Sequence, residues 1–388
     1  MLYVIILMGI SCFVIFYAMI GYPITLLLID KISENDSIKK DYNYEPAVTY
    51  MIVAHNEEDV IYKKMENALE LDYPKEKLQI LIASDYSTDK TDAIVEKFAN
   101  DNQDYDIILY RTLEHKGKTN AQNEAFGIST GEIVVMTDAN AILNRNAIRE
   151  LVASFTSDDI VYVCGRLEYS NIENETSESE SQYWNLDLKM RDIESRIQTI
   201  TAGNGSIYAV RKKEYIITPP IRCHDGYLPF QYALKEKRSI FNPDAISYEK
   251  AGEDNRDEFK RKVRMNRTIL EIFNSAPKVM NPLKYKWFSL FYFGHRTCRY
   301  LLWLMHIIFF GASIVLLFLC QSVIAWLIVI AQVIGLGLGI VSINHQLRNK
   351  YIRMIGYYSM TVIAQMVAAF KQITGQTKAT WEKAESTR

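Results

Sequence analysis

Charged residues are missing from two long stretches of this 388-residue sequence. Residues 1–29 contain no Asp, Glu, Lys or Arg, and residues 300–347 contain none either. A helix rises about 1.5 Å per residue, so about 20 apolar residues cross the hydrocarbon core of a bilayer. Because nearly all of the charge lies between the two stretches, the pattern excludes a simple soluble protein.

The sequence also has no excess of basic residues and no clustered cysteines. Its formal net charge of -2 excludes a nucleic-acid-binding protein that works through bulk basicity. Hydrophobic residues make up 49% and charged residues 23%, which argues against disorder and against a fibre. The five cysteines show no CxxC spacing, so we expect neither a disulfide framework nor a zinc site. Reduced thiols fit a cytoplasmic domain.

The charge-free stretches predict membrane-spanning helices at both ends of the chain. Residues 1–30 predict one N-terminal transmembrane helix. Residues 298–374 predict a C-terminal membrane region of two to three helices, with a tight turn near Gln321-Ser322. The last segment of that region, residues 354–370, is shorter and carries polar side chains. It therefore spans the bilayer, lies at the interface or enters the membrane and returns.

Basic residues set the expected orientation of the first segment. They follow the apolar run at Lys31, Lys39 and Lys40, which places its C-terminal end in the cytoplasm. A cleaved signal peptide is the alternative, but no Lys or Arg precedes the apolar run, and the run is too long for an h-region. We therefore predict a multi-pass plasma-membrane protein whose middle region is cytoplasmic.

Short apolar runs alternate with amphipathic stretches through the middle of the chain. Helical segments are expected from near Glu57, at about 119–128 and at 144–156, and strands are expected at 47–54, 78–83, 107–110, 133–137 and 160–164. Strands that are buried on both faces and separated by helices predict a parallel α/β sheet. Ligands bind such sheets beyond the carboxyl ends of the strands.

Polar residues follow several of these strands at that edge. Glu57 follows the first strand, Asp85 the second, and Asp138 with Asn140 the fourth. Alternate residues at a strand end point the same way, so Asp138 and Asn140 can share one divalent cation. Hard oxygen ligands suit Mg²⁺ or Mn²⁺, which also bind a substrate phosphate. A simple loop turn is the alternative for this pair.

A second set of polar residues lies further along the chain. Lys118 stands ahead of a helix in the run Lys-Gly-Lys, where it can meet an anionic group or remain a solvated surface lysine. Asn204 lies in a Gly-Asn-Gly turn before a short strand. Asp225 precedes an amphipathic helix that it could simply cap.

The segment that follows the soluble region is basic and amphipathic. Arg261 and Arg264 lie in the run KRKVR at 260–264, which is typical of a helix at a membrane surface. We therefore expect a soluble domain over 45–255 and amphipathic interfacial helices over 256–297.

The order of these motifs resembles family 2 of the inverting glycosyltransferases. The resemblance is to the membrane-integrated branch that includes hyaluronan, cellulose and poly-N-acetylglucosamine synthases. It runs from about Ala47 to Thr268 and is carried by VAHNEE (53–58), SDYSTD (84–89), KGKTNAQNEA (116–125), TDAN (137–140), TAGNGSIYAVR (201–211), CHDGYLPFQYALK (223–235) and RKVRM (261–265). It implies a Rossmann-like GT-A fold that holds a nucleotide-sugar donor, and transfer with inversion.

The resemblance also implies roles on the donor side. Glu57 and Asp85 would contact the base and ribose, and Lys118 would also reach the nucleotide. Asp138 would hold the metal ion on the diphosphate, with Asn140 as a weaker partner. In the basic helix, Arg264 helped by Arg261 would stabilise the departing diphosphate.

On the acceptor side, the resemblance makes Asp225 the general base. Asn204 would lie in the acceptor-side segment, and Tyr183 and Trp184 are candidate sugar platforms or, equally, core aromatics. Three positions depart from the family pattern, the first being Asn140, which is neutral where many relatives have Asp. His224 stands in place of the usual acidic neighbour of the base, and Met265 stands where processive synthases have Trp.

The sequence therefore predicts a membrane-embedded, metal-dependent glycosyltransferase. We expect a UDP-sugar donor and a growing cell-surface or extracellular polysaccharide as acceptor, with no nucleic-acid partner. The alternative within the enzyme class is transfer of a single sugar to a polyprenyl phosphate or lipid. A transporter or an inactive scaffold is the alternative from another class. The stretches 1–29 and 300–347 hold no Asp, Glu, Lys or Arg, and His306 and His345 are their only histidines, which argues against a transporter.

Overall fold

The chain forms two compact units in this computed structural model. The structure describes residues 1–33, 38–170, 175–250, 254–320, 322–345, 347 and 349–380, although not the side chains of 175–185. The helical unit comprises Met1–Ile32, Glu173–Tyr183 and Gly252–Thr377. The sheet unit comprises Ser33–Ile172, Trp184–Ala251 and Lys378–Arg388.

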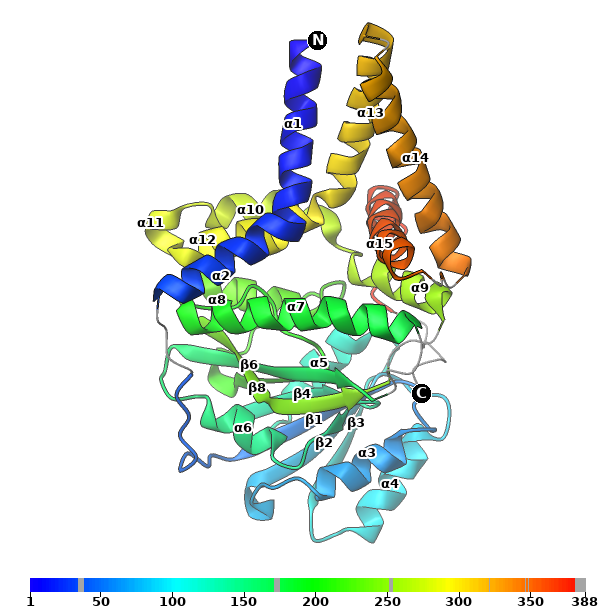
Figure 1. The fold of residues 1–388 in the computed structure, drawn as a ribbon. Coiled ribbons are helices and arrows are strands. Elements are labelled where there is room, and N and C mark those ends of the chain that lie inside the picture. Colours follow the sequence, from blue (N-terminus) through cyan, green and yellow to red (C-terminus); the bar gives the residue numbers. More distant parts are fainter. Residues whose placement is uncertain are drawn as a thin grey trace. The chain divides into compact units, whose positions relative to one another are not determined.

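A mixed eight-stranded sheet forms the centre of the sheet unit (Figure 1). The strands lie in the order β3-β2-β1-β4-β7-β6-β8-β5. Their bounds are β1 Val48–Ala54, β2 Leu78–Ser84, β3 Asp106–Arg111, β4 Ile133–Asp138, β5 Ile142–Leu143, β6 Ile160–Tyr169, β7 Ile207–Arg211 and β8 Arg238–Glu249. Strands β3, β2, β1 and β4 pair in parallel, whereas β7 runs antiparallel to both β4 and β6. The predicted α/β class is confirmed, but the sheet is mixed rather than parallel throughout: β5 and β7 run antiparallel to their neighbours, whereas β6 and β8 pair in parallel.

Helices cover both faces of this sheet because each strand buries alternate residues on opposite sides. Along β1, Tyr50 and Ile52 belong to one apolar core, and Met51 and Val53 belong to the other. The first core includes residues of α3 (Ile61–Leu69), α4 (Thr91–Asp101) and α6 (Ala147–Ala153), and the second includes residues of α5 (Lys118–Phe126) and α8 (His224–Leu234). Helix α7 (Glu175–Ile197) contributes residues to both units.

The strand register brings the expected ligand-binding residues to one edge. Val53 of β1 pairs with Asp138 of β4, and Ala54 of β1 pairs with Ser84 of β2. Asp85 follows Ser84 directly, and its amide donates to the Ala54 carbonyl at 2.8 Å. The carboxyl ends of β1, β2 and β4 therefore meet, as the topology of a parallel sheet requires.

The helical unit contains three helices that are long and apolar enough to cross a membrane. They are Leu2–Ser33, Leu302–Cys320 (α13) and Val323–Asn344 (α14). The first consists of α1 (Leu2–Phe16), a π-helical turn (Tyr17–Gly21) and α2 (Tyr22–Ser33). The other described helices of this unit are α9 Asn255–Met265, α10 Ile272–Val279, α11 Pro282–Tyr285, α12 Trp287–Phe291, a π-helix Tyr292–Cys298 and α15 Lys350–Ile373.

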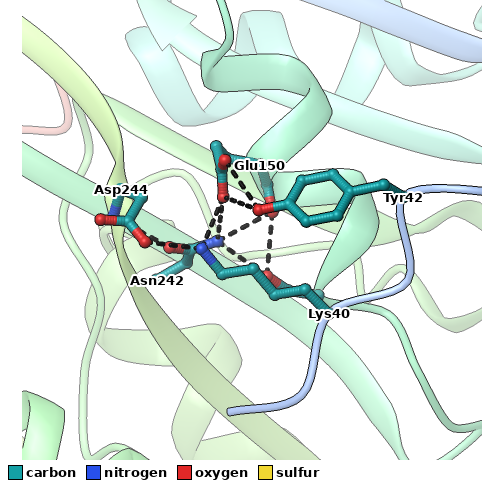
Figure 2. A network of polar contacts seen from close by, with 6 residues as sticks. Lys40, Tyr42, Glu150, Asn242 and Asp244 are labelled. Atoms are coloured by element: carbon teal, nitrogen blue, oxygen red, sulfur yellow. Dashed lines mark hydrogen bonds and ion pairs between the residues drawn. The ribbon is translucent and has the colours of Figure 1, made fainter. Parts of the chain in front are cut away.

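A buried carboxylate anchors the start of the sheet unit to its sheet (Figure 2). Glu150 of α6 accepts from Lys40 Nζ at 2.6 Å and from the Tyr42 hydroxyl at 3.0 Å. Asn242 of β8 donates to the Glu150 carbonyl at 2.8 Å, and Lys40 also contacts Asp244 at 2.6 Å. Burial lowers the pKa of Lys40, but its hydrogen bonds to Asp244 and Glu150 outweigh burial and raise it overall.

We expect Glu150→Gln to lower the stability of the sheet unit, because Lys40 loses its buried counter-charge. Lys40 keeps its pair with the exposed Asp244, and its hydrogen bond to position 150 changes from a charge-assisted one to a neutral one, so we expect a loss of about 1 kcal/mol. The measurement is the midpoint of thermal unfolding in detergent, with the exposed Glu70→Gln as the matched control. Equal midpoints for wild type and both variants would contradict this assignment.

Candidate functional site

Asp138 ends strand β4 and begins the turn expected to bind a metal ion. Its side chain is 31% exposed and forms an ion pair with Lys118. The Ala141 amide donates to the Asp138 carbonyl at 3.2 Å, which closes a turn with the partly exposed Asn140 inside it. The carboxylate therefore already accepts a cationic group, and the Asn140 amide supplies a second oxygen two residues on.

Lys118 joins three segments of the site. It is the first residue of α5, and its ammonium contacts Asp138 Oδ1 and donates to the Gly205 carbonyl at 3.2 Å. The preceding Gly117 has a φ of 97°, a conformation that favours glycine. A Cβ at Gly117 would also lie 2.7 Å from the carbonyl oxygen of Ala379, so no side chain fits there.

Asp225 lies in the first turn of α8 and contacts the Gly203–Gly205 turn, which Lys118 also contacts. Its carboxylate accepts from the Gly226 amide at 3.0 Å, and its carbonyl accepts from the Gly203 amide at 2.8 Å. The Gly203–Gly205 turn therefore connects Asp225 with the Lys118–Asp138 pair. The partly exposed carboxylate can act as a base, while its bond to Gly226 also satisfies one helix-start amide.

The expected acceptor-side residue Asn204 shapes this turn. It is buried, and its amide nitrogen donates to the Gly165 carbonyl. Its Oδ1 accepts from the amides of Ser206 and Ile207, each at 3.1 Å. Because both ends of the side chain bind the protein, the geometry favours a role in holding the turn rather than in touching a sugar. The sugar platforms predicted at Tyr183 and Trp184 lie outside the described side chains.

Asp85 organises the loop that leads to Lys118. Its carboxylate is fully buried and accepts from the amides of Lys116 at 3.2 Å and Gly117 at 2.9 Å. The His115 Nδ1 lies 2.8 Å from Asp85 Oδ2, and the His55 Nδ1 donates to the Asp85 carbonyl at 2.7 Å. The two imidazole rings stack with centroids 3.9 Å apart.

The two histidines were not among the predicted site residues. The ligand atoms of His55, Asp85 and His115 lie within 4.8 Å of one another, so this group could hold a metal ion. The sequence carried only a weak signal for it, because the histidines are 60 positions apart and meet only through the strand register.

Glu57 lies in the segment between β1 and α3. Its side chain is buried, and its amide donates to Thr91 Oγ1 at 2.8 Å.

The residues at the β4 turn fit a hard divalent cation. A carboxylate and an amide oxygen are the ligands that Mg²⁺ and Mn²⁺ prefer, and both ions accept further oxygens from water and phosphate. The Lys118 ammonium on Asp138 shows that this carboxylate takes a positive group. Asp138 and Asn140 therefore suit the predicted metal site.

His224, the neighbour of Asp225, is an uncharged core residue. Burial, helped by the charge of Lys118, lowers its pKa to about 3. Its Nε2 lies 3.1 Å from the Tyr215 hydroxyl, which donates to Asn123 Oδ1 at 2.8 Å. Because Tyr215 gives its proton to Asn123, His224 Nε2 is the donor in its own bond. His224 therefore anchors the start of α8 without adding a charge beside Asp225.

The two predicted diphosphate-stabilising arginines lie on α9, in the helical unit. Arg261 Nε donates to Glu258 at 2.7 Å, and Lys262 lies 3.4 Å from the same carboxylate. Burial raises the pKa of Glu258, but Arg261 and Lys262 outweigh it and lower the pKa overall. Arg261 is thus fixed by a buried acid, and Arg264 lies in the last turn of the helix.

The pKa of His224 predicts a pH dependence of stability. His224 titrates near pH 6.5 when unfolded and near pH 3 when folded, so the unfolded state holds more protons between these values. Stability is therefore fully present above pH 6.5 and is lost as the pH falls, by up to about 1.4 kcal/mol per pH unit.

We expect His224→Gln to flatten this loss, because the proton-binding group is gone. Unfolding midpoints between pH 7 and pH 5 provide the measurement, and the exposed His345→Gln is the matched control. Identical slopes for wild type and His224→Gln would show that His224 charges in the folded protein.

The chain is similar to known proteins in sequence and in fold. Residues 49–218 match the family described as Glycosyl transferase family 2. The Beta-monoglucosyldiacylglycerol synthase of Synechocystis sp. (strain ATCC 27184 / PCC 6803 / Kazusa) is 33% identical over 112 residues, which cover 29% of this chain and 23% of that protein. The Poly-beta-1,6-N-acetyl-D-glucosamine synthase of Staphylococcus aureus (strain MSSA476) is 30% identical over 122 residues, or 31% of this chain and 28% of that protein. The chain thus matches well under half the length of these relatives.

A solved structure matches nearly the whole chain. It is the mannosyltransferase PcManGT from Pyrobaculum calidifontis, determined in complex with GDP-Man and Mn²⁺. Its TM-score is 0.70 at 20% identity, and the match covers 95% of this chain and 99% of that one. At this identity the likeness shows a shared fold. Residues 49–218 of the sheet unit therefore match glycosyltransferase family 2, the chain shares its fold with a GT-A structural neighbour, and apolar helices precede and follow the matched region in the sequence.

Proposed function

We propose that this chain is a membrane-bound enzyme that transfers a sugar, with inversion, from a nucleotide-sugar donor to an acceptor hydroxyl. The observation that carries the proposal is the continuous set of contacts from Asp138 through Lys118 and the Gly203–Gly205 turn to Asp225. In this proposal, these contacts hold the diphosphate-binding group and the base at one edge of a GT-A sheet. The three apolar helices and the lysines after the first of them support a plasma-membrane enzyme with a cytoplasmic catalytic domain.

On the donor side, Asp138 and Asn140 would hold Mg²⁺ or Mn²⁺. The ion would neutralise negative charge on the diphosphate as the bond to the sugar breaks. The partly exposed Lys118 ammonium would contact the diphosphate from the start of α5. Asp85 and Glu57 would border the nucleoside, and the role of Arg264 and Arg261 at the leaving group stays a prediction from the sequence.

On the acceptor side, Asp225 would act as the general base. A sugar hydroxyl is a poor nucleophile, and a placed carboxylate that accepts its proton typically contributes about 10²- to 10⁴-fold in rate. The bond between the acceptor oxygen and the anomeric carbon forms as the bond to the diphosphate oxygen breaks, and the proton passes to Asp225. The uncharged His224 leaves this acid without a like-charged neighbour in the sequence.

The acceptor that we propose first is a growing cell-surface or extracellular polysaccharide, supplied with sugar from a UDP-sugar. A poly-N-acetylglucosamine synthase is among the relatives of the catalytic domain. The second candidate is a single transfer to a lipid or polyprenyl phosphate. Two observations favour it: Met265 stands in place of the family's Trp, and a glucosyldiacylglycerol synthase is also among the relatives.

We expect Asp225→Asn to retain donor binding but to lose transfer by about 10²- to 10⁴-fold, because only the base is removed. Titration calorimetry with UDP and with GDP in the presence of Mn²⁺ measures binding, and a radiolabelled sugar assay measures transfer. Asp158→Asn, on a side chain that is 90% exposed, is the matched control. Near wild-type turnover in Asp225→Asn would leave Asp225 as a helix-capping residue only.

The size of the product distinguishes the two acceptors. Full-length protein in vesicles is incubated with a panel of radiolabelled UDP- and GDP-sugars, and the product is separated by size and by extraction into organic solvent. A polysaccharide synthase yields a water-soluble product that lengthens with time. A product of fixed size that extracts with lipid would replace the first candidate by the second, and no transfer from any donor would contradict the enzyme assignment.

A further inference from the structure

A lysine is fully buried behind the turn that ends β4. Lys64 lies on α3 and has no exposed surface, in line with the apolar core residues Ile61, Met65 and Ala68 of the same helix. Lysine is almost never fully buried, because the ammonium loses its hydration. An apolar side chain of similar length would fill this space without that cost. The burial of an ammonium therefore indicates that it has a specific role at this position.

The Lys64 ammonium reaches the main chain of the turn. It donates to the carbonyl of Ala141 and lies 3.3 Å from Thr137 Oγ1. Thr137 in turn donates to the Ser206 carbonyl at 2.7 Å, beside the Gly203–Gly205 turn. Thr137 and Ala141 bracket the Asp138–Asn140 segment, so Lys64 holds both ends of it.

A second residue of α3, one helical turn after Lys64, also binds the main chain of this segment. Asn67 accepts from the Leu143 amide at 2.8 Å and donates to the Leu143 carbonyl at 2.9 Å. Residues three apart on a helix share a face, so Lys64 and Asn67 act on the same stretch of chain. The stretch from Thr137 to Leu143 is thus fixed to a rigid helix at three points.

The charge of Asp138 also affects the pKa of Lys64. Burial lowers its pKa to about 7, and the charges of Asp138 and Glu249 oppose that decrease. The negative charge of Asp138 thus favours the protonated form of Lys64. Its position is also set by the Tyr50 ring, whose centroid lies 5.3 Å from Nζ.

We propose that Lys64 is a positioning residue for the metal-binding turn, which it holds so that Asp138 and Asn140 present their oxygens to one cation. The inference rests on the proposed function, since it assumes that Asp138 binds the metal. Residues behind metal ligands orient them, and removing such a residue typically weakens metal affinity by about 10- to 100-fold.

The test compares Lys64→Met with Lys63→Met in the full-length protein in detergent. Lys63 is the exposed neighbour on the same helix, so the control removes one charge from α3 without touching the turn. Mn²⁺ binding is followed by electron paramagnetic resonance with UDP, and with GDP in a parallel series. We expect Lys64→Met to weaken Mn²⁺ affinity about 10- to 100-fold, and nucleotide binding without metal to stay unchanged. Lys63→Met should behave as wild type.

A second variant and a reference variant separate the outcomes. Lys64→Gln keeps a neutral donor and should recover part of the Mn²⁺ affinity lost in Lys64→Met. A folded Lys64→Met with wild-type affinity overturns the inference alone, provided that Asp138→Ala loses Mn²⁺ in the same assay. Wild-type affinity in Asp138→Ala would overturn the proposed metal site and the inference with it. If neither Lys64 variant folds, Lys64 serves folding and the inference is wrong.

Discussion

The arrangement of the site depends on two lysines that hold the same turn from different helices. Lys118 pairs with the Asp138 carboxylate, and Lys64 binds the Ala141 carbonyl. A carboxylate at the end of a buried strand borders an apolar core, where an uncompensated charge is costly. The two ammonium groups provide that compensation and, at the same time, fix β4 to α5 and to α3.

Hydrogen bonds and ion pairs also explain how the acids at one sheet edge coexist in this structure. Asp85 is satisfied by two main-chain amides, and Asp138 is satisfied by Lys118. Each carboxylate thus has its own partners, so repulsion between the acids does not require one of them to move away or to become protonated.

The sequence was informative where strands are buried on both faces. Strands β1, β2 and β4 are buried and read as apolar runs, β3 at the sheet edge is only partly buried, and the predicted bounds of all four agree with the structure to within one residue at each end. Strand β6 continues to Tyr169, five residues beyond its apolar part. The sequence did not predict this second half because it carries charged residues such as Arg166 and Glu168. Strand β8 contains Pro243 and polar residues, and it pairs over its length with β6, so no local pattern revealed it.

The same distinction applies to the site. Glu57, Asp85 and Asp138 were predictable because topology alone places residues that follow parallel strands at one edge. Lys64 was not, because lysines on amphipathic helices are usually solvated, and only the folded packing shows this one buried against a turn 73 residues away. His224 is similar: its sequence position beside Asp225 suggests chemistry, but its burial and its bond to Tyr215 make it a neutral anchor. Groups that act through the main chain of a neighbouring segment thus leave little trace in the sequence, whereas groups at strand ends are marked by the strands themselves.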